Sequence, residues 1–91
     1  MQVPHDELNK RIKDVTKHVV IGGVYRHYKY PDRKYFVEKI CIQESTLKPC
    51  VIYKDIASLS APSFVRDFES WNEKVEWEGK QVPRFMLTTH A

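Results

Sequence analysis

The sequence predicts a mainly β protein, a small antiparallel barrel with an N-terminal amphipathic helix and a short helix before the last strand. Short runs of aromatic and β-branched residues recur between residues 24 and 55, and turn residues separate them. Apolar residues recur at spacings of three and four near the N-terminus and again between residues 64 and 75. A chain of 91 residues has room for one domain with one modest core.

The first predicted element is a helix from Pro4 to about His18, because proline suits the first turn and acidic residues follow it. Its apolar residues form one narrow stripe, at Leu8, Ile12, Val15 and Val19. Lysine and arginine surround this stripe, so the helix can pack on a small sheet or dock on a partner, and packing is the favoured alternative. We therefore expect residues 1–21 to form a helical extension and residues 22–87 to form the barrel domain.

Three strands are predicted after the flexible Gly22-Gly23 pair. They cover residues 24–30, 34–43 and 49–55, each rich in residues that favour strands. The pair Pro31-Asp32 marks the first turn between them, and the polar segment 44–46 marks the second. Short strands at this spacing are typical of a small barrel.

The last third of the chain is predicted to form a loop over 58–63, a short helix from Phe64 to Val75 that ends by Gly79, and a final strand from Gln81 to Thr88. Pro83 limits this strand to an edge or a bulge. The apolar positions of the successive elements then predict the core, Val37, Ile40 or Cys41, Ile42, Val51, Tyr53, Phe64, Phe68, Val82 and Phe85.

The two cysteines lie symmetrically about Ser45-Thr46. If that pair is the tip of a tight hairpin, Cys41 faces Cys50 directly across the two strands. We expect both to be free thiols in a reducing compartment, packed as small apolar groups. Two cysteines without a further cysteine or histidine pair at ligand spacing do not make a zinc site, so no metal is expected.

The positive charge is concentrated in the first third of the chain. Residues 1–35 hold eight Lys or Arg and four Asp or Glu, whereas residues 36–91 hold seven Lys or Arg and eight Asp or Glu. These charges are either solvated faces of amphipathic elements or a functional patch. The basic third ends in a stretch that interleaves cations with tyrosines, and its candidate binding residues are Tyr25, Arg26, His27, Tyr28, Lys29, Tyr30, Arg33 and Lys34. Rings offer stacking faces and cations neutralise phosphate, so this stretch favours a flat or anionic ligand.

Catalysis is not predicted, because no spacing links the serine, cysteine, histidine and aspartate residues into a nucleophilic or acid–base set, and no cofactor motif occurs. The sequence instead indicates a non-catalytic binding module that binds single-stranded nucleic acid weakly. The alternative is a peptide or a small anionic ligand such as a nucleotide, bound either by one protomer or at a homo-oligomer interface. The chain has no membrane-spanning run and starts without a signal peptide, so a cytoplasmic location is expected.

An ordered set of short motifs resembles a small bacterial family, domain-of-unknown-function family 1653. The stretch from Gly23 to Lys29 is similar to its G-x-Y-x-H-Y-K opening, and the later matches are Tyr35 with Val37, Val51-Ile52-Tyr53, Val65-Arg66 and Pro83-Arg84-Phe85. This resemblance implies an SH3-like barrel, a bacterial or phage-like origin and no settled activity. Its matching segments add Arg66 and Arg84 to the candidate binding residues.

The chain departs from the family pattern at several places. Gln43-Glu44-Ser45-Thr46 stands where the family tends to have His-Ser-Glu-Thr, so the histidine is lost. Asp67 replaces the usual proline, and Phe64 stands where tryptophan is common. The segment from Pro4 to Val19 has no counterpart in the domain pattern.

Overall fold

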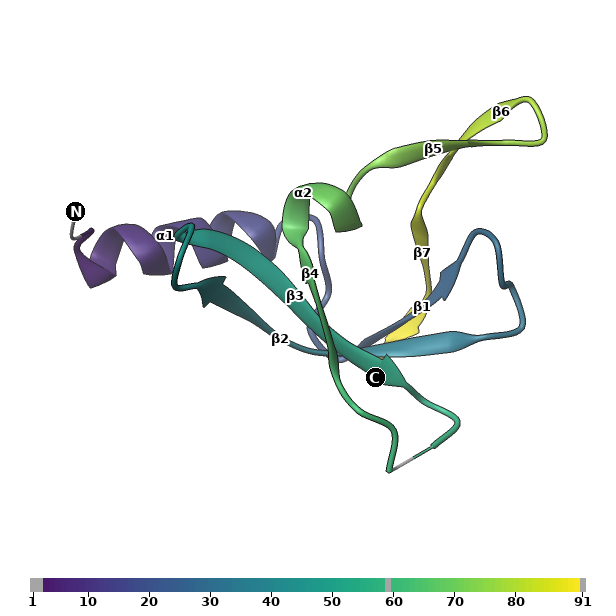
Figure 1. The fold of residues 1–91 in the computed structure, drawn as a ribbon, viewed down its shortest axis with the longest axis horizontal. Coiled ribbons are helices and arrows are strands. Elements are labelled where there is room, and N and C mark those ends of the chain that lie inside the picture. The colour runs from purple at the N-terminus through teal and green to yellow at the C-terminus, as the bar shows by residue number, and fades with distance from the viewer. Residues whose placement is uncertain (1–2, 59, 91) are drawn as a thin grey trace.

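The computed structural model describes residues 3–58 and 60–90 and confirms the mainly β fold (Figure 1). Five antiparallel strands, in the order β4-β3-β2-β1-β7, form a sheet that curls into a half-barrel, and β5 pairs with β6 in a separate hairpin. In chain order the elements are α1 His5–Val15, β1 Gly23–His27, β2 Lys34–Gln43, β3 Lys48–Asp55, β4 Phe64–Asp67, α2 Phe68–Trp71, β5 Lys74–Trp77, β6 Lys80–Pro83 and β7 Phe85–His90.

Two irregularities in the strand pairing accompany the curl. The register of β2 against β3 shifts between Val37 and Lys39, so that Glu38 is an extra residue in β2. The register of β1 against β7 shifts between Val24 and Tyr25. Bulges of this kind bend a strand and increase the local twist, which curls the sheet around the side chains on its concave face.

The core fills the concave side of the sheet and is strongly aromatic. Its buried residues are Val15, Val19, Tyr25, Val37, Ile40, Val51, Tyr53, Trp71 and Phe85. Trp71 comes from α2 and stacks on Phe85 of β7, with ring centroids 3.8 Å apart and an interplanar angle of 7°. Helix α2 therefore joins the two edge strands of the half-barrel, because it follows β4 directly and its tryptophan packs on β7.

The predicted N-terminal helix is confirmed and packs on the sheet. Val15 and Val19 are 3% and 1% exposed and belong to the same core as the strands. Arg11 Nη1 donates a hydrogen bond to the Leu47 carbonyl at 2.9 Å, which fixes α1 against the β2–β3 turn. The boundary at residues 21 and 22 between an extension and a barrel domain stays a prediction.

The predicted helix over Phe64 to Val75 is wrong at both ends. Residues 64–67 form strand β4, which pairs with β3, and only residues 68–71 are helical. The chain then forms the β5–β6 hairpin, whose two turn residues, Glu78 and Gly79, both have positive φ angles, 52° and 77°. Two-residue turns of this kind favour glycine, so Gly79 makes a hairpin tip and does not end a helix.

The predicted last strand is divided in two, and the first strand is shorter than predicted. Arg84 separates β6 from β7, and its backbone N–H donates to the Glu73 carbonyl at 3.1 Å, outside the ladder. Strand β1 ends at His27 instead of Tyr30. The segment beyond it turns back to β2 through the bonds of Tyr30 N–H to the His27 carbonyl and Arg33 N–H to the Tyr30 carbonyl.

The predicted core is confirmed at Val37, Ile40, Val51, Tyr53 and Phe85. It is wrong at Phe64, which is 47% exposed. Other predicted members are only partly buried, namely Cys41, Ile42, Phe68 and Val82. Buried residues that the prediction lacks are Val15, Val19, Tyr25, Cys50 and Trp71.

The predicted register of the cysteine pair is confirmed. Cys41 faces Cys50 across β2 and β3, and both are free thiols. The connecting turn covers four residues, 44–47, and includes Leu47 with a φ of 59°. Burial, aided by a 3.3 Å hydrogen bond from Cys50 Sγ to Asp67 Oδ1, raises the pKa of Cys50 to about 11. A thiol with so high a pKa is a poor nucleophile at neutral pH.

Candidate functional site

The concave side of the half-barrel opens into a hollow of about 320 Å³, here called the aromatic pocket. Its lining residues are His27, Tyr30, Tyr35, Tyr53, Phe64, Arg66 and Phe85. These come from all five strands of the sheet and from the turn between β1 and β2. The pocket therefore exists because the sheet is curled and not closed, so that inward-facing side chains remain accessible at its mouth.

The rings of this pocket support one another through edge-to-face contacts. Tyr53 lies 5.6 Å from both Tyr35 and Phe85, measured between ring centroids, with interplanar angles of 85° and 65°. Trp71 stacks on Phe85 and holds that ring in place. Such pairs add stabilisation beyond the area that they bury. These ring contacts fix the buried part of the pocket.

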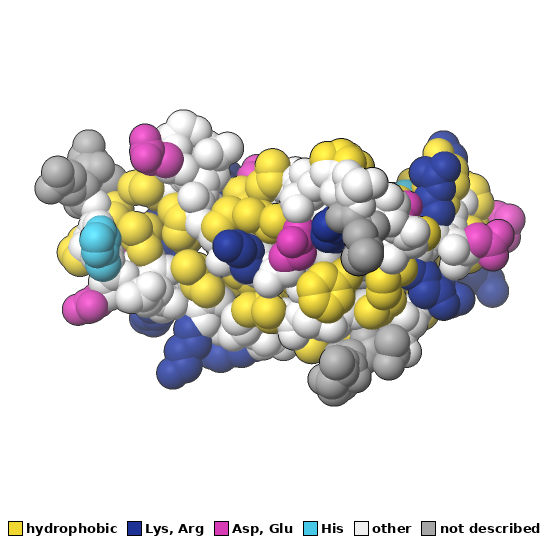
Figure 2. Space-filling view, turned by 90° about the horizontal axis from the view of Figure 1, so that it is seen from below, with side chains coloured by type: hydrophobic (Ala, Val, Ile, Leu, Met, Phe, Trp, Pro, Cys, Tyr) yellow, Lys and Arg dark blue, Asp and Glu magenta, His cyan; other side chains and the backbone are white. Residues whose placement is uncertain are grey.

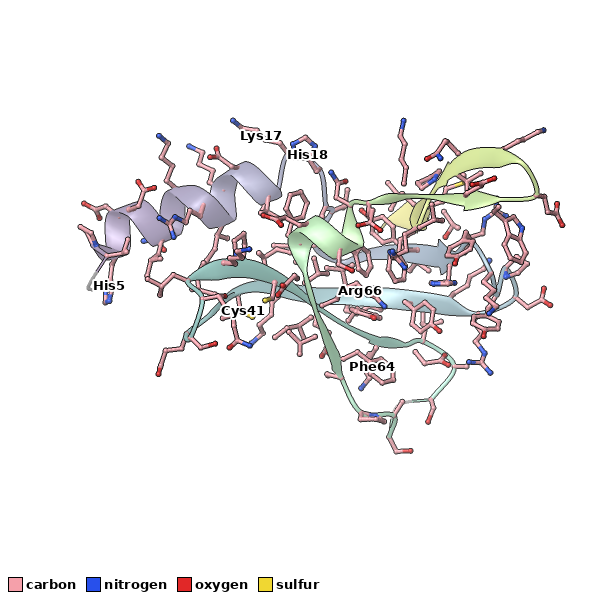
Figure 3. The ribbon with its side chains drawn as sticks, turned by 45° about the horizontal axis from the view of Figure 1, so that its top comes forward. His5, Lys17, His18, Cys41, Phe64 and Arg66 are labelled. Atoms are coloured by element: carbon pink, nitrogen blue, oxygen red, sulfur yellow. The ribbon has the colours of Figure 1, made fainter. Side chains whose placement is uncertain are left out.

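Arg66 is the cation that lines the aromatic pocket, and Figure 3 shows it with Phe64 on β4, the strand that crosses in front of the sheet. Its Nη1 donates to Ser70 Oγ at 2.9 Å, and its guanidinium carbon lies 5.6 Å from the centroid of the Phe85 ring. Among the described residues no hydrogen-bond acceptor meets its buried Nε. No carboxylate neutralises Arg66 among the ion pairs of the described residues, so its charge is available to an anionic ligand.

His27 forms part of the wall at the end of β1. Partial burial lowers the pKa of His27 below its usual 6.5, and the nearby positive charges of Arg66, Arg84 and Lys29 lower it further. Its Nδ1 accepts a hydrogen bond from the Lys29 backbone N–H at 3.1 Å. The imidazole is therefore neutral at pH 7 and contributes a ring surface, and the positive charge of the pocket comes from arginine and lysine.

The lowered pKa of His27 predicts how its contribution to stability depends on pH. The folded pKa lies below the unfolded value of 6.5, so the contribution is complete above that pH and is lost as the pH falls toward the folded pKa. We expect the free energy of unfolding to fall less between about pH 7 and about pH 5 in a His27→Phe variant than in the wild type. Urea denaturation at each pH measures this, and His5→Phe, at an exposed position on α1, is the control. Equal pH dependence in the His27→Phe variant and the wild type would contradict the assignment.

The turn beside the aromatic pocket carries two further cations around one ring. Lys29 Nζ lies 5.7 Å from the centroid of the Tyr30 ring, and the Arg33 guanidinium carbon lies 5.1 Å from it. On the inner side Tyr30 stacks with His27 at 5.5 Å. Positive charge therefore lies at the rim of the pocket.

The structure divides the other candidate binding residues among different environments. Tyr25 is in the core, 4% exposed, and its hydroxyl accepts a hydrogen bond from the Val20 N–H. Arg84 has a structural role, because it donates to the Ser70 carbonyl and pairs with Glu73 Oε1 at 2.8 Å. The remaining three residues, Arg26, Tyr28 and Lys34, do not line the aromatic pocket.

Four pocket residues were absent from the candidate binding set, namely Tyr35, Tyr53, Phe64 and Phe85. Three of them were predicted as core residues, and their strand positions do place them on the inward face. The available signal was the excess of large rings at such positions, since a core this small has little space for them all. Whether the rings are covered or accessible depends on the closure of the sheet, which strand patterns do not encode.

Among the described residues, no helix is both long and apolar enough to cross a membrane. No curated protein is significantly similar to the chain. A crystal structure of a DUF1653 protein from Bordetella bronchiseptica is 31% identical and has a TM-score of 0.65, over 77% of this chain and 88% of that chain. A family model described as "Protein of unknown function (DUF1653)" matches residues 23–87, which confirms the resemblance found in the motifs. The chain therefore belongs to the DUF1653 family.

Proposed function

We propose that this protein is a non-catalytic binding module that binds single-stranded nucleic acid, with one base in the aromatic pocket and the adjoining phosphates beside the cations. The observation that carries the proposal is the convergence of six rings and Arg66 around a hollow of about 320 Å³. Stacking on aromatic side chains tolerates any base, because every base has a π-face. We therefore expect little sequence preference.

The charges around the pocket support an anionic ligand. The cations at or near its rim are Lys29, Arg33 and Arg66, and Lys29 and Arg33 are exposed. Figure 2 shows Lys and Arg side chains at the end of the molecule opposite α1, beside exposed hydrophobic side chains. A cationic ligand is disfavoured here, because it would meet Arg66 inside the pocket.

The size of the aromatic pocket favours a second candidate function, the binding of a free nucleotide or another small anion that carries a ring. A hollow of about 320 Å³ lies at the low end of the range of roughly 300–1,000 Å³ that is usual for small-molecule sites. It therefore has space for one ring system. Both candidates use the same rings and the same arginine, and they differ in whether neighbouring nucleotides add affinity.

The double charge reversal Arg33→Glu with Lys34→Glu is expected to weaken binding of a fluorescent single-stranded oligonucleotide. Both side chains are exposed, and Arg33 lies beside the Tyr30 ring at the rim, so the fold is expected to persist. Each phosphate contact that is lost should reduce the slope of log affinity against log salt by roughly one. Fluorescence anisotropy from about 50 mM salt upward measures affinity and slope together.

Lys10→Glu with Lys13→Glu is the matched control, because it changes the net charge equally on exposed positions of α1. We expect it to change oligonucleotide affinity much less than the Arg33→Glu, Lys34→Glu variant does. Equal weakening by the two variants would mean that binding follows net charge and not this site. Absence of any wild-type binding at about 50 mM salt, where phosphate contacts are strongest, would reject the proposed function.

The proposal includes a cytoplasmic location, where single-stranded RNA and DNA are accessible and cysteines remain reduced. Both cysteines are free, which is compatible with such a compartment. The proposal that the module is non-catalytic rests on the sequence, in which no spacing links nucleophilic or acid–base residues into a set.

A further inference from the structure

A second hollow, of about 240 Å³, lies on the other side of the turn that follows β1 and is here called the Trp77 pocket. Its walls include Arg26 from β1, Tyr28 and Pro31 from the turn, Trp77 from the β5–β6 hairpin and Met86 from β7. Figure 1 shows that the β5–β6 hairpin projects at the same end of the molecule as this turn, away from α1. Neither the family assignment nor the proposed base site accounts for this hollow.

A continuous series of rings joins the Trp77 pocket to the aromatic pocket. His27 lies 5.5 Å from Tyr30 and 4.6 Å from Tyr28, measured between ring centroids. Tyr28 in turn lies 5.4 Å from Trp77, at an interplanar angle of 75°. The turn contributes Tyr30 to one pocket and Tyr28 with Pro31 to the other, so it forms the wall between them.

The Trp77 pocket also has cations beside it and accessible apolar walls. Arg26 Nη2 lies 3.4 Å from Met86 Sδ in its lining. Lys34 is the strand partner of Arg26 across β1 and β2, so both side chains emerge on the same face. Trp77 and Met86 are 38% and 43% exposed, which leaves them free to contact a ligand.

We propose that the Trp77 pocket is a second base subsite, so that one single strand passes over the turn with neighbouring bases in the two pockets. This inference rests on the proposed function of the aromatic pocket. Nucleic acid is the occupant indicated here because the same turn supplies ring surfaces to both pockets and positive charge lies beside each. A repeating anion with a ring on every unit matches that arrangement.

The test compares thymidine monophosphate, (dT)2 and (dT)8 as ligands, with Trp77→Ala as the variant. Trp77 is partly exposed, and circular dichroism checks that the variant remains folded. We expect Trp77→Ala to weaken (dT)8 binding roughly tenfold, the value of one base–ring stack, and to leave binding of the monophosphate unchanged. The octamer should also quench the fluorescence of Trp77, and a Trp77→Phe variant should lose that quenching.

Two further variants separate the second subsite from the first. Met86→Ala removes another wall of the Trp77 pocket and is expected to affect only (dT)2 and (dT)8, whereas Phe64→Ala should weaken all three ligands. Val65→Ala, 61% exposed on β4 and outside both pockets, is the neutral control. Unchanged (dT)8 binding in Trp77→Ala and Met86→Ala, with weakening in Phe64→Ala, would overturn the second subsite and leave the first. Failure of the wild type to bind any of the three ligands would overturn both.

Discussion

Replacing Trp71 with alanine is expected to lower the free energy of unfolding by about 3–5 kcal/mol. The indole is 3% exposed, and it makes edge contacts with Tyr25 and Tyr53 in addition to its stack on Phe85. The alanine variant would leave a large cavity between α2 and the sheet, which the surrounding rings cannot fill without moving. Small domains have a total stability of about 5–15 kcal/mol, so the variant should be close to unfolding at room temperature.

Urea denaturation followed by circular dichroism measures this loss, since it does not depend on the tryptophan signal that the substitution removes. Trp77→Ala is the control, because that indole is 38% exposed and lies outside the core. The Trp77→Ala substitution should lower the free energy of unfolding by about 1 kcal/mol or less. Similar losses for the two tryptophans would show that α2 does not hold the half-barrel in the way described.

The parts of the fold that the sequence predicted correctly are those set by local signals. The bounds predicted for β2, residues 34–43, match the structure, because Pro31-Asp32 and the polar segment 44–46 mark its ends. The facing of Cys41 and Cys50 also follows from the turn between them. In each case neighbouring residues determine the conformation, and distant contacts only reinforce it.

The segment from 64 to 75 shows where local signals were misleading. Its apolar residues recur at helical spacing, yet Phe64 pairs with Tyr53 in a strand and Trp71 alone is buried. The backbone groups of β3 would lack partners on one side without β4, and those tertiary hydrogen bonds outweigh the weak helical preference of a short segment. The hairpin tip at Glu78-Gly79 was the local signal that opposed a helix.

The candidate site was predicted only in part, and for a geometric reason. His27, Tyr30 and Arg66 do line the aromatic pocket, whereas Arg26 and Tyr28 line the Trp77 pocket. Successive strand residues face opposite sides, so an uninterrupted run of candidates had to divide between two faces. The sequence could indicate that rings and cations lie close together but not which of them share a pocket.

Replacing Val19 with aspartate is expected to lower the free energy of unfolding by about 3–5 kcal/mol, because it would bury an unpaired carboxylate. Val19 is 1% exposed, lies after α1 and packs with the strands. The family match begins at residue 23, so this substitution tests whether the preceding segment is an appendage or a part of the folded unit. A removable extension would tolerate the change, whereas a segment that supplies core side chains would not.

Ile21→Asp is the matched control, since it introduces the same carboxylate two residues later, at a position that is 50% exposed. We expect the control to change stability by about 0.5 kcal/mol or less. Urea denaturation of both variants, followed by circular dichroism, measures the difference. If both variants unfold at the wild-type urea concentration, the segment around Val19 contributes nothing to the stability of the barrel and the predicted boundary at residues 21 and 22 is supported. If only Val19→Asp is destabilised, the folded unit includes residues that precede the region matched by the family model.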